Sequence, residues 1–441
     1  MKKRILSCFL VVSMAFGILT GCGSGESVET GKEELSGVET TTNNGGEKKK
    51  IVFWYSHTGA EGSYYAQAAQ DFNESQDQYE VEALSVTDRQ KYIVAISGNE
   101  APDVIEISNQ DIITYANNGL IEDLQVVANE DSYSLDVYSK QALEANTIND
   151  SIYGIPLLSV IIQMFYNKDI LEEIGYSEPP ETMEELYEMA VKATQVDESG
   201  TITRLGYPLF PLASARQELI YAFGGSWWAE DGNTLTPDNP NNIESLKMNL
   251  SYREGYEISK VQEFIGTANT NRYSENDMFF AGKQLFRFDG PWLSAMIKEF
   301  ESDVNYGVTM IPGTKANPEN RGSSRYETAS FAIPIVAKEK NGAWEFIKFA
   351  TNSAETKDIL LGVGSLPALL SLYEDKDILE QPNYEAFVEA LKLENGIQYA
   401  KITDFAKYIS LIDEHLDYVY NGMQSPEEAM KNLAEQSKLL E

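Results

Sequence analysis

The five residues 51–55 (Ile-Val-Phe-Trp-Tyr) restrict the possible folds of this chain more than any other feature. They are β-branched or aromatic in succession, without the apolar–polar alternation of a strand that has one face in water. Such a run is typical of a strand buried on both faces, as in a parallel sheet covered by helices. We therefore expect strands and amphipathic helices to alternate along the chain.

The residues that follow this run keep to that expectation. Tyr65, Ala68, Ala69 and Phe72 fall at positions i, i+3, i+4 and i+7, which predicts a helix with one apolar face. Alternating strand and helix patterns predict an α/β fold. The other predicted strands are 79–84, 104–107, 161–166, 284–288, 306–311 and 330–336, and the other predicted helices are 88–97, 111–118, 182–194, 343–350 and one that begins after Ser425.

Three local patterns locate the ends of elements. Thr182 with Glu185 forms the capping-box pattern of a helix start. Ser425 before Pro426 combines an N-cap residue with a proline at the first helical position. Residues 231–232 (Asp-Gly) predict a tight turn between 227–229 and 234–236.

The amino-terminal segment has the pattern of a secretory signal peptide. Lys2, Lys3 and Arg4 precede an apolar stretch, residues 5–19, that is too short to span a membrane. Residues 19–22 (Leu-Thr-Gly-Cys) resemble a bacterial lipobox, which implies a signal peptide over 1–21 and a lipidated Cys22. The alternative is an ordinary signal peptide with a chance cysteine at its end.

Residues 22–50 are predicted to be a disordered tether, since they contain no aromatic residue and many Gly, Ser, Thr and Glu. Cys8 and Cys22 are the chain's two cysteines. If the leader is removed and Cys22 is lipidated, no thiol remains for a disulfide, a Cys-ligated metal or thiol catalysis. We expect no cofactor and no metal.

The formal net charge of −35 excludes nucleic acid as a natural partner. Anionic lipid headgroups would also repel an acidic surface, so we expect contact with the membrane only through the lipid anchor. The protein is expected to be a monomer on the extracellular face of the bacterial cytoplasmic membrane.

Several short motifs occur in one order over about half of the chain. They are 153–156 (Tyr-Gly-Ile-Pro), 165–169 (Phe-Tyr-Asn-Lys-Asp), 179–182 (Pro-Pro-Glu-Thr), 224–225 (Gly-Gly), 280–283 (Phe-Ala-Gly-Lys), 289–292 (Asp-Gly-Pro-Trp), 305–308 (Asn-Tyr-Gly-Val) and 366–367 (Leu-Pro). In this order the motifs resemble those of the extracellular solute-binding proteins of ABC importers, in particular the carbohydrate-binding, maltose-binding-protein-like group. The resemblance covers nearly everything after Lys50.

The resemblance implies a two-lobed, periplasmic-binding-protein-like α/β fold, each lobe a mostly parallel sheet flanked by helices. The expected N-lobe is 51–156 plus 325–362, and the expected C-lobe is 157–312 plus 366–441. It also implies that a small molecule, a saccharide, binds between the lobes, closes a hinge and is delivered to ABC permease subunits in the membrane.

A saccharide needs aromatic rings for its apolar faces and polar side chains for its hydroxyl groups. Trp54, Tyr55, Ser56 and His57 lie at the carboxyl end of the first strand, where open α/β sheets bind ligands. The alternative is that Trp54 lies in the core and only the residues beyond it are exposed.

The Asp-Gly-Pro-Trp motif supplies Asp289 and Trp292 at the end of another predicted strand. In similar proteins the tryptophan of this segment stacks on the sugar, which makes Trp292 the first candidate. The alternative for Trp292 is a place in the core.

The remaining candidates have weaker support. They are Asp103, Asn109, Gln110, Gln217, Trp227, Tyr326 and Glu327. Asp103 begins a predicted strand instead of ending it, so a structural role is equally compatible with its position. Trp227 and Trp228 are adjacent on a predicted strand and point to opposite faces, so at most one of them can stack on a ligand.

The sequence argues against an enzyme. His57 and His415 are its two histidines, which leaves no histidine pair at metal-binding spacing. The nucleophile-elbow, P-loop and dinucleotide-binding motifs are missing after the predicted strands. Three alternatives to a sugar receptor stay open: a surface glycosidase that uses two carboxylates, a ligand sensor without transport, and a binding protein for a non-sugar solute.

Overall fold

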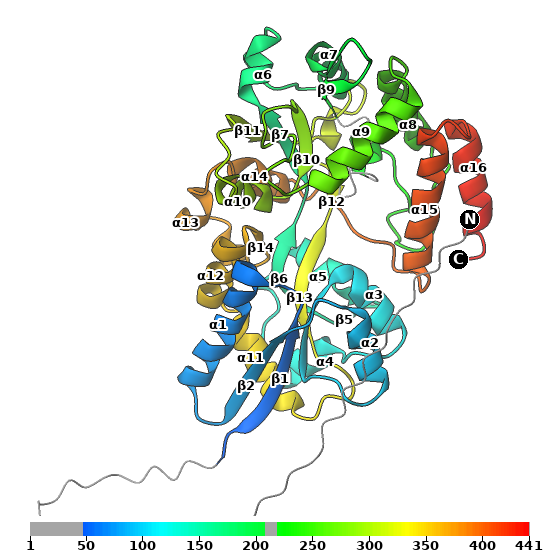
Figure 1. Cartoon of the computed structure of the whole chain (residues 1–441). Coiled ribbons are helices and arrows are strands. Elements are labelled where there is room, and N and C mark those ends of the chain that lie inside the picture. Colours follow the sequence, from blue (N-terminus) through cyan, green and yellow to red (C-terminus); the bar gives the residue numbers. More distant parts are fainter. Residues whose placement is uncertain (1–46, 208–217, 441) are drawn as a thin grey trace, which may run out of the picture. The chain divides into compact units, whose positions relative to one another are not determined.

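The computed structural model describes residues 47–207 and 218–440. In these residues helices and strands alternate around two main sheets (Figure 1), so the α/β prediction is confirmed. The segment 208–217, which contains the candidate Gln217, lies outside the described residues.

The larger sheet has six strands within the described residues, in the order β14-β6-β13-β3-β1-β2. β1 pairs in parallel with β2 and β3, and β13 pairs antiparallel with both β3 and β6. β2, β1, β3 and β6 therefore run in one direction, and β13 runs in the other. The bounds are β1 Lys49–Tyr55, β2 Tyr79–Ser85, β3 Val104–Ser108, β6 Ile155–Val160, β13 Glu327–Ala332 and β14 Leu366–Pro367.

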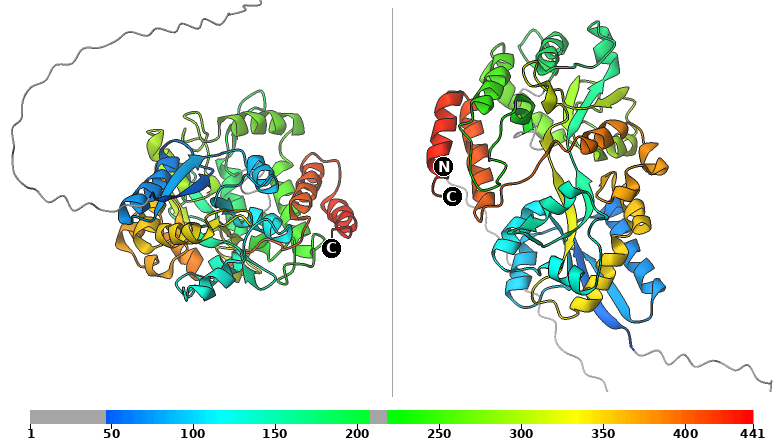
Figure 2. Two further views of the ribbon diagram at one scale, coloured as in Figure 1. Left: turned by 90° about the horizontal axis from the view of Figure 1, so that it is seen from below. Right: turned by 180° about the vertical axis from the view of Figure 1, so that it is seen from behind.

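Helices cover both faces of this sheet (Figures 1 and 2). Phe53 of β1 packs on one face against Phe346 and Phe331, at ring-centroid distances of 5.1 and 5.3 Å. Trp54 points to the opposite face and packs on Tyr92, at 5.5 Å. The prediction that β1 is covered on both faces is confirmed. The flanking helices are α1 Gly59–Ser75, α2 Gln90–Ser97, α3 Asn109–Asn117, α4 Leu124–Glu130, α5 Lys140–Ala145, α11 Lys340–Ala350 and α12 Ser353–Val363.

The smaller sheet contains β7 Gln163–Asn167 between β10 Phe286–Asp289 and β11 Tyr306–Thr309. Both pairings are antiparallel, so the expected mostly parallel arrangement is not found in this sheet. β10 and β11 therefore run in the same direction and β7 between them runs in the other, while Ile161 and Ile162 carry the chain directly from β6 into β7.

Several predicted strands have other bounds than expected; for example, 284–288 is observed as Phe286–Asp289 and 306–311 as Tyr306–Thr309. The segment 161–166 was expected to be one strand, but Ile161 and Ile162 are the link between the sheets. The segment 330–336 is replaced by Glu327–Ala332, because Pro334 has no N–H to continue the ladder. The boundaries of the predicted lobes stay predictions, and the pairing of β14 with β6 would place residues 157–160 and 366–367 in the N-lobe.

The predicted helix caps are confirmed. Thr182 Oγ1 accepts from the N–H of Glu185, and Ser425 Oγ accepts from the N–H of Glu428. The turn at Gly232 has the positive φ, 69°, that glycine adopts without strain. The remaining helices of the described chain are α6 Lys168–Glu173, α7 Met183–Ala193, α8 Pro240–Arg253, α9 Ile258–Asn271, α10 Trp292–Glu299, α13 Lys376–Leu379, α14 Glu385–Lys392, α15 Phe405–Tyr420 and α16 Pro426–Ser437.

Short strand pairs complete the fold: β4 Thr147–Ile148 with β5 Ser151–Ile152, β8 Gln195–Val196 with β9 Ile202–Arg204, and β12 Ser324–Arg325 with β15 Gly396–Ile397. The last pair joins a segment before β13 to a late segment of the chain. In residues 47–207 and 218–440, no helix has the length and apolar character needed to cross a bilayer.

Candidate functional site

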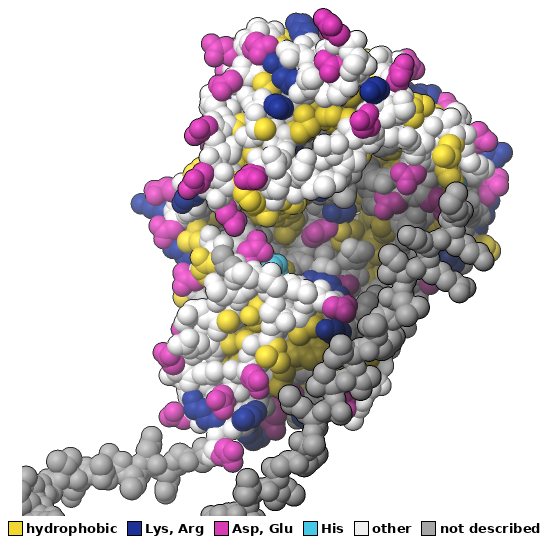
Figure 3. Space-filling view, in the orientation of Figure 1, with side chains coloured by type: hydrophobic (Ala, Val, Ile, Leu, Met, Phe, Trp, Pro, Cys, Tyr) yellow, Lys and Arg dark blue, Asp and Glu magenta, His cyan; other side chains and the backbone are white. Residues whose placement is uncertain are grey.

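The carboxyl ends of β1 and β3 carry the first group of candidates. Ser56 and His57 follow β1, while Asn109 and Gln110 begin α3 directly after β3. Arg89 immediately precedes α2, in the segment that follows β2. In open α/β sheets ligands bind beyond these strand ends. Figure 3 shows the surface hollowed across the middle of one face, with side chains of both charge signs along the hollow.

Glu106 of β3 holds this group together. Its Oε2 accepts from the backbone N–H of Ser56 at 3.1 Å and from Ser56 Oγ at 2.8 Å. Arg89 donates from Nη2 to Ser56 Oγ at 2.8 Å and pairs through Nη1 with Asp111 Oδ2 at 2.6 Å. The Glu106 side chain is 2% exposed, whereas the Arg89 side chain is 34% exposed. We call Ser56, His57, Arg89, Glu106 and Asp111 the Glu106 cluster.

His57 is stacked at the edge of this cluster. Its ring lies 4.9 Å from the ring of Tyr65, nearly parallel, and Tyr65 stacks in turn on Tyr55 at 5.4 Å. Burial lowers the pKa of His57, but a hydrogen bond to Glu61 and the charges of Glu106 and Glu61 outweigh burial and leave this pKa raised. His57 Nδ1 is 3.3 Å from Glu61 Oε2.

Trp292 begins α10 and is half-buried. Its indole Nε1 donates to the hydroxyl of Tyr273 at 3.1 Å. A Cβ atom on Gly290 would lie 2.1 to 2.4 Å from three atoms of the indole ring, so the ring rests directly on the glycine backbone. The sequence therefore places a glycine where the indole must approach the main chain.

Behind Trp292 lies a buried group of charges. Arg287 Nη1 donates to both carboxylate oxygens of Asp277 at 2.7 Å, and its Nε donates to Asp289 Oδ2 at 2.8 Å. Arg272 Nη2 is 3.3 Å from the same Asp289 oxygen. Burial lowers the pKa of Arg287, and the charges of Asp289 and Asp277 raise it by more. We call Arg272, Tyr273, Asp277, Arg287 and Asp289 the Asp289 cluster.

Tyr326 and Glu327 lie where β12 leads into β13. Tyr326 is fully buried, and its hydroxyl shares a hydrogen bond with Ser159 Oγ at 2.6 Å. Glu327 is half-buried; it pairs with Arg325 Nε at 2.7 Å and accepts a hydrogen bond from Tyr399. Tyr326 thus fixes the backbone near the link between the sheets, and Glu327 keeps a partly exposed carboxylate.

Asp103 lies at the other end of β3. Its carboxylate accepts from the backbone N–H groups of Val52, Lys338 and Glu339, at 3.0, 2.8 and 2.9 Å. It ties β1 to the start of α11, and we leave it out of the site that we propose.

Several other candidates are occupied by structural contacts. Asn109 is 1% exposed and joins α3 to β13 through the carbonyl of Tyr326 and the N–H of Thr328. Trp227 is fully buried, as is most of Trp228, whose Nε1 donates to the carbonyl of Gln398. Trp54 and Tyr55 pack against the sheet's flanking helices. Gln110 is half-buried at the start of α3.

Sequence reasoning missed Arg89, Glu106 and Tyr273. Glu106 had a signal, since it stands between Ile105 and Ile107 in a strand predicted to be buried, and a buried carboxylate must be paired. Tyr273 had none, because its partners Asp289 and Trp292 are brought to it by a separate strand and helix.

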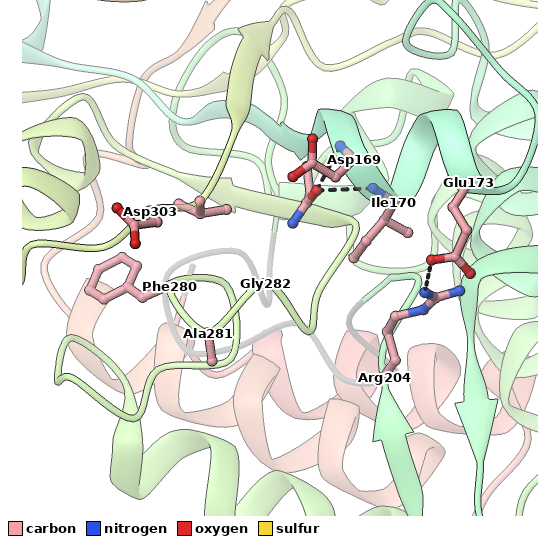
Figure 4. A pocket seen from close by; sticks show the side chains of 10 residues that line it. Asp169, Ile170, Glu173, Arg204, Phe280, Ala281, Gly282 and Asp303 are labelled. Carbon is pink, nitrogen blue, oxygen red and sulfur yellow. Dashed lines mark hydrogen bonds and ion pairs between the residues drawn. The ribbon is translucent and has the colours of Figure 1, made fainter.

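A separate hollow of about 470 Å³ opens beside α6 (Figure 4). Glu173 and Arg204 lie at one end of this hollow, where they form an ion pair at 2.6 Å. Phe280 and Asp303 lie at the other end. None of the predicted site residues lines it. Within the described chain, no group of three or more His, Cys, Asp or Glu residues is placed to hold a metal ion.

Comparison with known proteins identifies relatives over most of the chain. The chain is 23% identical over 347 residues to a maltotriose-binding protein of Pyrococcus abyssi, which covers 78% of this chain and 72% of that protein. It is 25% identical over 345 residues to a galactooligosaccharide-binding protein of Bacillus subtilis, which covers 76% of each.

Solved structures share the fold. CpMnBP1 with mannotriose bound superimposes with a TM-score of 0.75 at 23% identity, over 88% of this chain and 100% of that one. Maltose-bound MalE3 of T. maritima gives a TM-score of 0.71 at 22% identity, over 89% and 100%. The predicted two-lobed, periplasmic-binding-protein-like fold class is thereby confirmed. The family described as bacterial extracellular solute-binding protein matches residues 55–357, more than half of the chain, and the protein therefore belongs to this family.

Proposed function

We propose that this protein captures a sugar or an oligosaccharide between two lobes and delivers it to the permease subunits of an ABC importer. It would act as a receptor without turnover, held on the extracellular face of the cytoplasmic membrane by lipid on Cys22. The relatives named above bind maltotriose or galactooligosaccharides by their names, which supports a saccharide ligand.

The single observation that carries this proposal is the setting of Trp292. A half-buried tryptophan whose N–H is already bonded offers its ring, and not a donor, to a ligand. Aromatic faces pack against the C–H groups of a sugar ring, and an indole held in one rotamer loses little entropy on binding.

The Glu106 cluster supplies the polar half of the site. Ser56, His57, Arg89 and Asp111 are partly exposed, so their donors and acceptors can exchange water for the hydroxyl groups of a ligand. Gln110, Glu327 and Gln217 stay in the proposal as further contacts, whereas the predicted contact Asp289 is fully buried and bonded to Arg287 and Tyr273, so it lies behind the site. The charges in this cluster are paired with one another, which favours a neutral ligand over an ionic one.

Binding is tested with the chain that starts at residue 22 and carries Cys22→Ser, so that no lipid interferes. A thermal-shift screen should find stabilisation by at least one of maltotriose, mannotriose or a galacto-oligosaccharide, because a ligand that binds only the folded state raises the melting temperature. Glycerophosphodiesters and short peptides form the non-sugar arm. Stabilisation by that arm alone would contradict a saccharide ligand.

Trp292→Ala should weaken binding of the saccharide found in the screen by at least about tenfold, or about 1.4 kcal/mol. Trp292→Phe is the matched control, since it keeps an aromatic face. Titration calorimetry gives both affinities. Unchanged affinity in Trp292→Ala would remove Trp292 from the site, and release of reducing ends from an oligosaccharide during the titration would favour a glycosidase.

The anchor is tested separately in cells. The wild-type protein should sediment with membranes and carry diacylglyceryl on Cys22 in mass spectra, while Cys22→Ser should appear in the medium. Membrane retention of Cys22→Ser would contradict the lipid anchor and leave the binding proposal untouched.

A further inference from the structure

Trp292 is held in place by a chain of contacts that starts at a buried carboxylate. Its Nε1 donates to Tyr273 Oη at 3.1 Å, and Tyr273 Oη donates to Asp289 Oδ1 at 2.7 Å. Asp289 is fully buried, and the same oxygen also accepts from the N–H of Gly290 at 2.9 Å. The hydroxyl of Tyr273 thus bonds both the indole N–H and the carboxylate, and it also accepts from Arg272 Nη2 at 2.7 Å.

The ring of Tyr273 is fixed as firmly as its hydroxyl. The guanidinium of Arg272 lies 4.5 Å from the ring centroid, and that of Arg287 lies 5.1 Å from it. The Tyr273 N–H donates to Asp277 Oδ2 at 3.0 Å. The backbone, the ring and the hydroxyl of Tyr273 therefore all contact other members of the Asp289 cluster.

The backbone of Tyr273 is itself unusual. Its φ of 56° lies in the left-handed region, which costs a non-glycine residue free energy and is kept only where surrounding contacts determine it. The contacts to Asp277 and Asp289 are of that kind. Since strain of this sort gathers at functional sites, it points to a role for Tyr273 beyond filling space.

We infer that Tyr273 is the positioning residue of the proposed binding site, which fixes the indole of Trp292 in the orientation that receives the ligand. Tyr273 acts through Trp292 and need not touch the ligand. The inference rests on the proposed function for its effect on affinity, whereas the effect of Tyr273 on the indole itself does not depend on any ligand.

Tyr273→Phe removes the hydroxyl and keeps the ring between the two guanidinium groups. In protein labelled with 5-fluorotryptophan, the five tryptophans should give separate fluorine resonances, and Trp292→Phe would identify that of Trp292. We expect Tyr273→Phe to shift and broaden the Trp292 resonance alone. An unchanged Trp292 resonance would overturn the inference, whatever the protein binds.

Affinity for the saccharide found by thermal shift gives the second readout. Tyr273→Phe should weaken binding about three- to tenfold, the range expected for loss of one hydrogen bond. In the Trp292→Phe background, which has no indole N–H to hold, Tyr273→Phe should have little further effect. Equal losses in both backgrounds would show that Tyr273 acts independently of Trp292 and would overturn the inference.

Tyr138→Phe is the matched control. Tyr138 is a buried tyrosine, whereas Tyr273 is half-buried; the Tyr138 hydroxyl donates to Thr351 Oγ1 at 3.0 Å and shares a hydrogen bond with Tyr133 Oη at 3.0 Å. Tyr138→Phe should lower stability, because it removes buried hydrogen bonds, and it should leave both the Trp292 resonance and the affinity unchanged. A loss of affinity in Tyr138→Phe as large as that in Tyr273→Phe would assign the effect to stability alone.

Discussion

The Glu106 cluster and the Asp289 cluster are built from similar residues and differ in their access to water. In the Glu106 cluster a buried carboxylate is surrounded by side chains that remain about one third exposed, such as Arg89. In the Asp289 cluster both carboxylates and Arg287 are at most 4% exposed.

The difference in access to water suits the two clusters to different roles. Charges that water reaches can exchange that water for a ligand, and their mutual attraction is weakened by the solvent. Charges sealed from water depend on one another, because a single buried charge without its partner is costly. In the proposed site, the Asp289 cluster would therefore support Trp292, and the Glu106 cluster would recognise the polar groups of the ligand.

The largest expected effect comes from removing the cation of the Asp289 cluster. Arg287→Met leaves the carboxylates of Asp277 and Asp289 buried without their shared cation, so unfolding free energy should fall by about 3–5 kcal/mol. Arg89→Met in the Glu106 cluster should lower the unfolding free energy by no more than about 2 kcal/mol. Urea denaturation measures both, and equal losses would erase the distinction between the two clusters.

A smaller effect is expected from Gly290→Ala. The new Cβ would meet the indole of Trp292 at 2.1 to 2.4 Å, so the ring must move, at a cost of about 1–3 kcal/mol in stability. Saccharide affinity should fall with it. Gly266→Ala is the control, because its Cβ would meet no atom within 4 Å and alanine favours the α9 helix by about 0.5–1 kcal/mol. Unchanged affinity in Gly290→Ala would show that the ring can move without harm.

The sequence was sufficient to predict most helices and strands, but not the side-chain contacts between them. The run 51–55 predicted a doubly covered strand, and the observed β1 is covered on both faces, because burial of that many apolar residues leaves few alternatives. The helix predicted at 111–118 begins at Asn109, since Ser108 supplies the cap that the pattern did not reveal.

The candidate site followed the same division. The motif and the strand end gave the positions of Trp292 and Ser56, whose contact with a ligand stays a prediction. Trp227 is fully buried instead, because aromatic residues beside a turn fill a core as readily as they line a cleft. Tyr273 could not be predicted, since its role depends on distances to Trp292 and Asp289 that no spacing in the sequence encodes.

The electrostatics of the Glu106 cluster can be tested through the pKa of His57. A hydrogen bond to Glu61 and the charge of Glu106 hold the pKa of His57 above its ordinary value, against the effect of burial. Glu61→Gln should lower this pKa more than Glu106→Gln does, because Glu61 supplies both a hydrogen bond and a charge. Proton NMR titration of the His57 ring measures each change, and a pKa that rises in either variant would contradict the assigned causes.

The smallest effect concerns the second histidine. His415 of α15 is 1% exposed, and burial lowers its pKa, although Glu414 and hydrogen bonds to Gln436 and Gln424 oppose that shift. The unfolded chain therefore binds a proton at higher pH than the folded chain does. The stability that neutral His415 contributes should be present above the unfolded pKa, about 6.5, and should be lost as pH falls through the folded pKa.

His57 has the opposite sign, since its folded pKa is raised: its contribution is present below pH 6.5 and is lost as pH rises through the folded pKa. His415→Gln should flatten the acid side of the stability profile, and His57→Gln should steepen it slightly. Urea denaturation between pH 5 and 8 measures both slopes. If both substitutions changed the slope of unfolding free energy against pH in the same direction, the two opposite pKa shifts would be contradicted. Burial lowers the pKa of His415, whereas neighbouring carboxylates raise that of His57.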